Sequence, residues 1–130
     1  MAAPAAHRRL HAELETYSYP AGWEYRFEQD TDRLPQVTRT FWTEQVAPER
    51  NSDAAATLLR AAGYTDVYVT VPPEPAWYSW RVTGTRGRMT ATVMLPSPYT
   101  PDPENPAFHP AEPGKARGAV VQFTLTEGTD

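Results

Sequence analysis

The sequence contains no cysteine among its 130 residues. A disulfide framework, a thiolate metal site and a cysteine nucleophile are therefore excluded. The sequence also lacks any apolar run approaching 18 residues, so we expect a soluble chain with no membrane span. Neither a GxGxxG nor a GxxxxGK motif is present, which leaves nucleotide binding through a phosphate-cradling loop without support.

Runs of one charge sign are missing as well. The 16 acidic and 12 basic side chains are spread along the sequence and give a net charge of -4, and lysine occurs only at Lys115. Proteins that bind nucleic acid usually carry a basic arm or stripe, which this sequence lacks. We therefore expect no nucleic-acid partner.

What is present suffices for one folded core. A chain of 130 residues with 40% hydrophobic and 12% aromatic residues is typical of a single domain, here spanning residues 1–130. Half of the 14 prolines fall between residues 96 and 113. Because a strand pattern resumes after this segment, we expect residues 96–114 to form a proline-rich crossover loop.

Two stretches have the periodicity of helices. Leu10, Leu14 and Tyr17 recur on one side of a helix predicted over residues 5–17. A second helix is predicted to begin near Pro48, which suits the first turn of a helix, with Asn51, Ser52 and Asp53 as alternative caps. Its apolar stripe consists of Ala55, Leu58, Leu59 and Ala62.

The end of the second helix is marked by a glycine. Gly63 is predicted to terminate the helix in the left-handed conformation. Tyr64 is then placed to fold back on Leu59 in a Schellman-type contact.

Period-2 alternation of apolar and polar residues predicts strands elsewhere. The first strand has Trp23, Tyr25 and Phe27 on one apolar face. Further strands are expected at residues 67–71, 77–83, 88–95 and 119–126. Residues 37–42 favour a strand but could also begin a short helical turn. The predicted fold class is therefore α+β, with a mainly antiparallel sheet of four to six strands and two helices packed on one face.

A hairpin loop is expected at residues 84–87, and its length decides which side chains share a face. An even loop places Tyr78, Trp80 and Val82 with Met89, Ala91, Val93 and Leu95 on one apolar face. An odd loop mixes that set with polar residues. We therefore expect the even loop.

Candidate catalytic and metal-binding residues are few. His7, His11 and Glu15 share one side of the first predicted helix, a possible metal-ligand set. They lie near a chain end, beside the apolar stripe and without an HExxH arrangement, so we expect no metal and no other cofactor. No serine stands in a GxSxG elbow, and we assign no catalytic residue. The acidic residues available for acid-base chemistry are Glu24, Glu28, Asp30, Asp32, Glu44, Asp66 and Glu74.

The face of the hairpin opposite its apolar face is the candidate binding surface. In the even register it carries Trp77, Arg81, Arg88 and Met94 among serines and threonines. Tryptophan, methionine and arginine are enriched in the centres of protein interfaces. Two readings stay open: Tyr99 and Phe108 of the proline-rich segment cover Trp77 and Met94, or they join them in binding a protein partner.

A second candidate site is aromatic. Trp23, Tyr25, Trp42 and Trp80 are candidates to line a ligand pocket between the sheet and the helices. Core packing is the simpler account of the same residues, because they alternate along their strands.

The order of elements carries a family resemblance. A leucine-containing helix, the strand Trp23-Glu24-Tyr25, the segment Leu58 to Tyr64 and the hairpin from Arg81 to Arg88 resemble small uncharacterised actinobacterial envelope or lipoprotein-type domains. The resemblance implies a non-catalytic binding or interaction module and transfers no functional residues. The chain has neither a lipobox cysteine nor a signal segment. We expect the chain as given to be cytoplasmic, and an envelope or secreted location if an export signal has been removed.

The functional expectation is a small protein-interaction module of the immunity, inhibitor or accessory-factor type. The alternatives are a small-ligand-binding protein or minor enzyme that uses the aromatic pocket, and a structural subunit of a larger particle.

Overall fold

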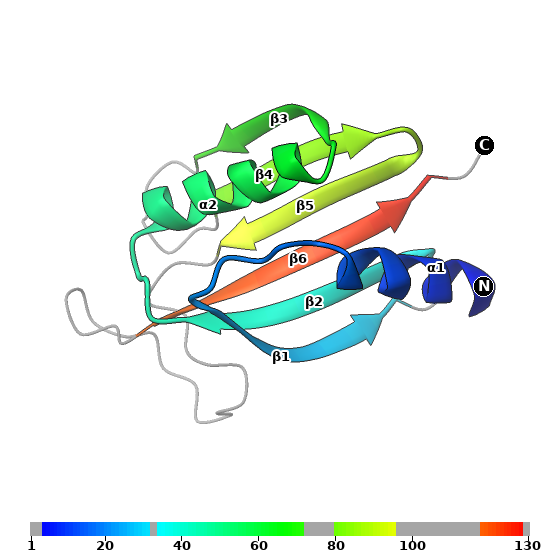
Figure 1. The fold of residues 1–130 in the computed structure, drawn as a ribbon, viewed down its shortest axis with the longest axis horizontal. Coiled ribbons are helices and arrows are strands. Elements are labelled where there is room, and N and C mark those ends of the chain that lie inside the picture. Colours follow the sequence, from blue (N-terminus) through cyan, green and yellow to red (C-terminus); the bar gives the residue numbers. More distant parts are fainter. Residues whose placement is uncertain (1–3, 32–33, 72–79, 96–117, 129–130) are drawn as a thin grey trace.

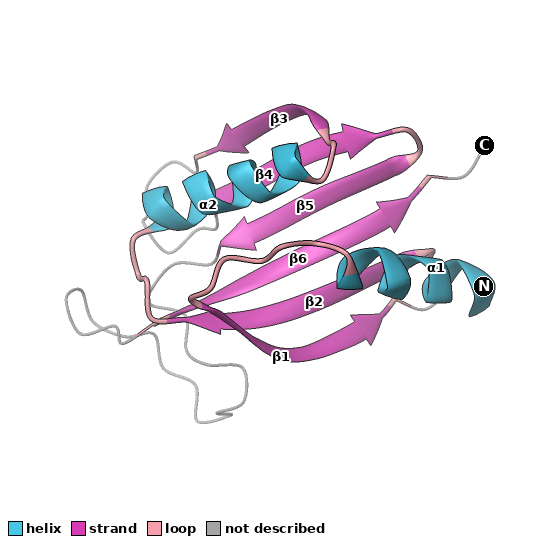
Figure 2. Cartoon of the chain, viewed as in Figure 1, coloured by secondary structure: helices cyan, strands magenta, loops and turns pink. Residues whose placement is uncertain are grey.

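The structure is a computed structural model that describes residues 4–31, 34–71, 80–95 and 118–128. Within these ranges the chain forms two helices and six strands (Figures 1 and 2). In chain order the elements are α1 (Pro4–Glu15), β1 (Trp23–Asp30), β2 (Gln36–Thr43), α2 (Pro48–Ala61), β3 (Thr65–Thr70), β4 (Trp80–Arg86), β5 (Met89–Leu95) and β6 (Ala119–Glu127).

The strands form one antiparallel sheet in the order β1-β2-β6-β5-β4-β3. The chain crosses the sheet once between described elements, from β2 through α2 to β3 at the far edge. The last strand, β6, enters the middle of the sheet beside β5. The predicted crossover loop therefore connects two neighbouring strands, and its own residues lie outside the described part of the chain.

Both helices pack on the same face of the sheet, which confirms the predicted α+β class (Figure 1). Helix α1 lies over β2 and β6, and α2 lies over β3, β4 and β5. The helices contribute the predicted leucine stripes to the hydrophobic core, and each strand contributes the side chains of one face. The largest fully buried side chains between these layers are Phe41, Phe123, Leu10, Leu14, Leu59 and Leu125.

The end of α2 has the predicted Schellman geometry. Gly63 has a φ of 91°, where a side chain would be strained. The Tyr64 amide donates to the Leu59 carbonyl at 3.0 Å and the Gly63 amide donates to the Arg60 carbonyl at 3.1 Å. These bonds return the chain into β3 with Tyr64 buried in the core.

The β4–β5 hairpin has the expected even register but a different turn. Trp80 lies opposite Leu95 and Val82 opposite Val93, so the apolar residues share the helix-covered face. The connection is only Gly87-Arg88, and β4 continues through Gly84. Gly84 fits the close packing of the strand, because a Cβ there would lie 3.1 Å from Tyr64 Cβ and from Val67 Cγ2. The glycine therefore marks a close approach and not the loop that was predicted.

Strand β1 contains a bulge that the sequence pattern did not reveal. Tyr25 pairs with Phe41 and Phe27 pairs with Thr40, which leaves Arg26 as the extra residue. The bulge exchanges the faces of the strand: Tyr25 shares the helix-covered face with Phe41, whereas Phe27 shares the opposite face with Thr40. The prediction of a single apolar face for this strand was therefore wrong.

Candidate functional site

The face of the sheet opposite the helices is the first candidate site, and we call it the helix-free face. No described helix packs against it. The register gives its residues, because directly paired residues point to the same side of a sheet. They are Glu24, Phe27, Gln29, Gln36, Thr38, Thr40, Trp42, Thr65, Tyr68, Thr70, Arg81, Thr83, Thr85, Thr90, Thr92, Met94, Val120, Gln122, Thr124 and Thr126.

Threonines form two straight rows across this face. One row runs over four adjacent strands as Thr83, Thr92, Thr124 and Thr38, and the next contains Thr85, Thr90 and Thr126. Within the first row the hydroxyls of Thr38 and Thr124 are hydrogen-bonded at 2.9 Å. These short β-branched side chains lose little rotamer freedom when a surface is covered.

Larger side chains lie at one end of the threonine rows. Arg81 pairs with Met94 on β5 and with Thr70 on β3. Tyr68 pairs with Thr83 and its side chain is 57% exposed. Arg81 is exposed as well, and Met94 is half-buried between its neighbours. An arginine, a tyrosine and a methionine therefore meet over β3, β4 and β5.

The opposite end of the helix-free face is more enclosed. Thr40 and Val120 are buried there. Gly118 packs so closely on Trp42 that a Cβ at this position would lie 2.7 Å from Trp42 Cε2. Beyond Trp42 lies an open depression of ≈ 550 Å³, lined by Ala21, Gly22, Glu24, Arg26, Trp42, Thr43, Glu44 and Gln45. Among the described residues, the exposed side chains at the β3 and β4 end of the face therefore include Arg81 and Tyr68.

The structure brings together only some of the predicted binding residues. Arg81 and Met94 are direct neighbours, as the even register predicted. Arg88 lies in the turn at the other end of the hairpin, where its Nη2 donates to the Gly128 carbonyl at 2.7 Å, so it does not join them. Trp77, Tyr99 and Phe108 lie outside the described residues.

The four aromatic residues proposed for a ligand pocket do not share one surface. Trp23 is buried against Phe41, with ring centroids 5.6 Å apart, and its indole nitrogen donates to Asn51 Oδ1 at 3.3 Å. Tyr25 is 53% exposed, and Trp80 packs at the edge of the core. Trp42 pairs with Glu24 on the helix-free face. One pocket between sheet and helices therefore cannot be lined by all four.

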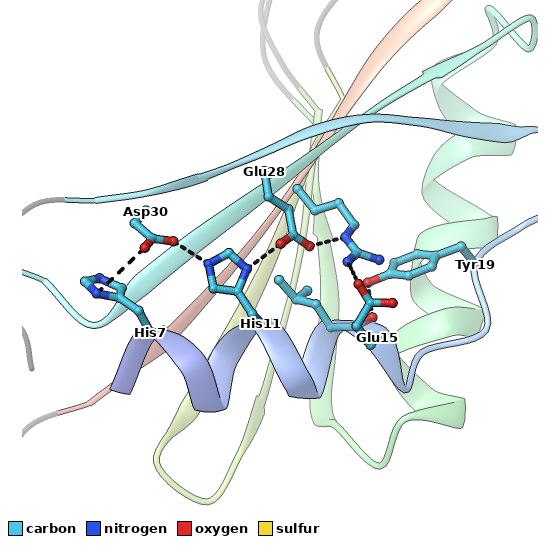
Figure 3. A network of polar contacts seen from close by, with 8 residues as sticks. His7, His11, Glu15, Tyr19, Glu28 and Asp30 are labelled. Atoms are coloured by element: carbon cyan, nitrogen blue, oxygen red, sulfur yellow. Dashed lines mark hydrogen bonds and ion pairs between the residues drawn. The ribbon is translucent and has the colours of Figure 1, made fainter. Parts of the chain in front are cut away.

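A charged network on the helix-covered side is the second candidate site (Figure 3). The bulge at Arg26 turns Glu28 and Asp30 toward α1. The ring of His11 lies between them, with Nδ1 bonded to Glu28 Oε2 and Nε2 bonded to Asp30 Oδ1 at 2.5 Å. Two of the acidic residues singled out in the sequence therefore converge on one histidine.

Arg39 of β2 extends the network toward the centre of the sheet. Its side chain is buried, its Nε donates to Glu28 Oε1, and its Nη2 donates to Glu15 Oε1 at 2.6 Å. The guanidinium carbon also lies 5.4 Å from the ring centroid of Tyr19 and 5.0 Å from that of Tyr25, within the range of cation–π contacts. The network thus connects α1, β1 and β2.

His7 stands at the outer end of the same line (Figure 3). Its Nε2 lies 2.9 Å from the Leu34 carbonyl, and its Nδ1 lies 4.0 Å from Asp30 Oδ2. His7, His11 and Glu15 share one side of α1 as predicted, but each is directed at a different partner. Among the residues that the structure describes, no group of three or more histidine, aspartate or glutamate side chains is arranged to hold a metal ion.

The protonation of His11 follows from its surroundings. Burial lowers the pKa of His11, but the hydrogen bonds and negative charges of Glu28 and Asp30 outweigh burial and raise the pKa above 6.5. A protonated imidazole donates from both nitrogens, which is what two flanking carboxylates require. With both nitrogens engaged, this histidine holds α1 on the sheet and has no free lone pair for base catalysis.

The raised pKa of His11 predicts a pH-dependent stability. A group whose pKa is raised on folding stabilises the native state fully below its unfolded pKa, and this contribution is lost as the pH rises through the folded pKa. We expect His11→Gln to lower the free energy of unfolding by roughly 1 kcal/mol at pH 6, a modest value because the site is partly exposed. At pH 9 the loss is expected to be clearly smaller, because the contribution of His11 disappears as the pH rises. Urea unfolding of both proteins between these pH values measures the difference, and a pH-independent difference would contradict this assignment.

Tyr68 and the threonine rows were not singled out from the sequence. Tyr68 alternates with Val67 and Val69, which marks it as facing away from the valines. That signal was present, but only the pairing of β3 with β4 shows that Tyr68 joins the face of Arg81. The threonine rows need the order of four strands, which no local pattern contains.

Comparisons of this chain with protein-family models, with curated protein sequences and with solved structures find no match. The resemblance to actinobacterial envelope domains therefore stays a prediction. Neither helix in the described ranges has the length and apolar character needed to cross a membrane.

Proposed function

We propose that this chain is a small, non-catalytic protein-interaction module of the immunity, inhibitor or accessory-factor type. It binds a protein partner through the helix-free face. The observation that carries this proposal is the meeting of Arg81, Met94 and the exposed Tyr68 on the side of the sheet opposite both helices.

The composition of this surface suits an interface. Tyrosine and arginine dominate the residues whose truncation weakens protein complexes, and methionine adapts its shape to a partner. The threonine rows beside them present methyl and hydroxyl groups at little cost in side-chain entropy. Arg81 supplies a positive charge, so the partner surface is expected to be acidic or rich in hydrogen-bond acceptors opposite it.

The charged network and the depression at Trp42 favour binding over catalysis. Both ring nitrogens of His11 are occupied by carboxylates, and Arg39 is held by two further carboxylate contacts. The depression at Trp42 contains glutamate, glutamine and arginine side chains but no histidine. It borders the same face, where it offers a recess for a side chain of the partner.

A charge reversal tests the binding surface. The tagged chain carrying Arg81→Glu is expected to recover its partner from the producing cells at least about 10-fold less efficiently than the unaltered chain. This factor corresponds to the loss of about 1.4 kcal/mol, a moderate value for a central interface arginine. Quantitative mass spectrometry of the recovered proteins provides the measurement.

Arg60→Glu is the matched control, since Arg60 is equally a surface arginine but lies on α2, on the other side of the sheet. It is expected to recover the partner as the unaltered chain does. Equal recovery with Arg81→Glu and Arg60→Glu would contradict the choice of face.

A further inference from the structure

Strand β3 exposes apolar side chains at an open edge of the sheet. Among the strands that the structure describes, it is the outermost on its side and pairs only with β4. Tyr68 is 57% exposed, Val69 41% and Val71, directly after the strand, 56%. Among the described residues only two other large hydrophobic side chains are exposed to this degree, Tyr25 and Leu34. Within the described part of the chain, the exposed large apolar side chains are therefore concentrated at this edge.

The opposite edge of the sheet, strand β1, is protected against pairing with a further strand, whereas β3 is not. Edge strands are normally shielded from pairing by charges and by bulges. Strand β1 carries Glu24, Arg26, Glu28 and Asp30, and the bulge at Arg26 interrupts its ladder. Strand β3 has one charged residue, Asp66, at its beginning, where the pairing with β4 is irregular. From Val67 to Val71 the chain is uncharged.

The register fixes which backbone groups of β3 point outward. The two-residue turn makes Arg86 and Met89 a hydrogen-bonded pair, and such pairs alternate along an antiparallel ladder. Thr83 and Arg81 therefore direct their backbone groups toward β3, where they meet Tyr68 and Thr70. The amides and carbonyls of Val67 and Val69 consequently face away from the sheet.

We propose that β3 pairs antiparallel with β3 of a second copy of this chain, about a two-fold axis at Val69. In this register Val67 lies opposite Val71 of the second copy, and Tyr68 lies opposite its Thr70. The two six-stranded sheets become continuous. Two-fold pairing is isologous, so one surface patch serves both copies.

The self-complementarity of β3 favours a second copy over another partner. The residues whose backbone groups face outward are valines in both directions from the axis, so each of these valines meets a valine of the second copy. The Asp66 residues of the two copies lie at opposite ends of the paired segment and do not repel each other. A short edge-to-edge contact buries little surface, so the dimer is expected to be weak and to form in the micromolar range or above. The inference does not depend on the proposed function, because Arg81 lies on a face and not at this edge.

The lack of cysteine makes the register directly testable. Directly paired hydrogen-bonded residues have Cα atoms about 5.5 Å apart, which a disulfide spans. The Val69→Cys chain is expected to form a covalent dimer on mild oxidation. Thr65→Cys lies on the same strand but far from the two-fold axis, and it is expected to stay monomeric under the same conditions.

Sedimentation velocity of the unaltered chain, from about 1 µM to about 500 µM, tests the association without any cross-link. A concentration-dependent dimer is expected. Val69→Pro removes an outward amide without breaking a bond to β4 and is expected to abolish the dimer. If the proline variant does not fold, Val71→Lys, just outside the strand, serves in its place and is expected to abolish the dimer. Tyr25→Lys, at the other edge of the sheet, is the control and is expected to leave the dimer intact.

Three results would overturn the inference. They are a monomer at every concentration, equal cross-linking of Thr65→Cys and Val69→Cys, and a dimer that survives both Val69→Pro and Val71→Lys. A monomer that instead binds an extended peptide at β3 would equally overturn the assignment of a second copy. Loss of the proposed partner in the Arg81→Glu experiment would be a separate result, since that variant leaves β3 unchanged.

Discussion

Arg39→Met is expected to lower the free energy of unfolding by about 3 kcal/mol, because it removes the buried cation that contacts Glu28 and leaves this largely buried carboxylate with His11 alone. Arg39 is only 6% exposed, and the Glu28 side chain is 12% exposed. Glu15, the second carboxylate on this arginine, has a side chain that is 72% exposed and regains water. The cost therefore comes chiefly from Glu28. Denaturant unfolding at neutral pH measures it.

A double variant separates the stranded charge from the lost packing. Arg39→Met combined with Glu28→Gln removes both charges, so it is expected to be more stable than Arg39→Met alone. Arg9→Met is the control, since Arg9 also contacts a glutamate, Glu127, but has a side chain that is 60% exposed. It is expected to cost less than about 1 kcal/mol. Similar costs for Arg9→Met and Arg39→Met would contradict the importance assigned to the buried network.

Gly118→Ala is expected to destabilise the fold by about 2 to 3 kcal/mol, through overpacking and not through loss of a contact. A Cβ at Gly118 would lie 2.6 Å from the Thr43 carbonyl oxygen and 2.7 Å from Trp42 Cε2. The carbonyl belongs to β2, so the strand itself has to move to relieve the contact. Thermal and denaturant unfolding of the variant give the size of the effect.

Gly22→Ala is the matched control for this substitution. Gly22 lines the depression beside Trp42, but the nearest atom to its added Cβ is Thr43 Oγ1 at 3.8 Å, an ordinary contact distance. We expect its effect to stay within about 0.5 kcal/mol. Combining Gly118→Ala with Trp42→Ala relieves the contact with the ring but not the contact with the backbone. If Gly118→Ala alone leaves the free energy of unfolding unchanged, the close packing of Gly118 on Trp42 is contradicted.

Much of the fold follows from local patterns in the sequence. The end of α2 at Gly63 and the return of Tyr64 were predicted, because the Schellman motif depends on residues that are adjacent in the chain. The register of β4 against β5 was also predicted, since only an even connection keeps Val82 and Val93 on one face. Both predictions concern short sequence separations.

The failures have a common physical origin in contacts between distant segments. Gly84 was predicted to lie in the loop, but it belongs to the strand, where Tyr64 and Val67 leave little room for a Cβ. Phe27 was predicted to share a face with Tyr25, but Arg26 bulges and brings Glu28 to His11 and Arg39. Local alternation contains no information on these partners.

The candidate site was predicted only in part for the same reason. Arg81 and Met94 come from one hairpin, so their proximity could be read from the sequence. Tyr68 comes from a strand whose place beside β4 is set by the crossover through α2. Arg88 was assigned to this surface by alternation, but a residue in a tight turn no longer follows the alternation of its strand.

The two faces of the sheet have different roles in this account. The helix-covered face contains the core and the charged network that holds α1, so changes there are expected to act on stability. The helix-free face contains uncharged threonine rows beside Arg81 and Tyr68, so changes there are expected to act on binding with little effect on stability. The stability variants Arg39→Met and Gly118→Ala and the binding variant Arg81→Glu are distinguished by this difference.

Site-specific photo-cross-linking in the producing cells tests the central claim most directly. A photoreactive residue at Thr83, between Tyr68 and Thr92 on the helix-free face, is expected to cross-link one specific protein. The same residue at Thr57, exposed on α2 on the other side of the sheet, is expected to give no such product. A partner captured from Thr57 but not from Thr83 would contradict the assignment of the helix-free face as the binding surface.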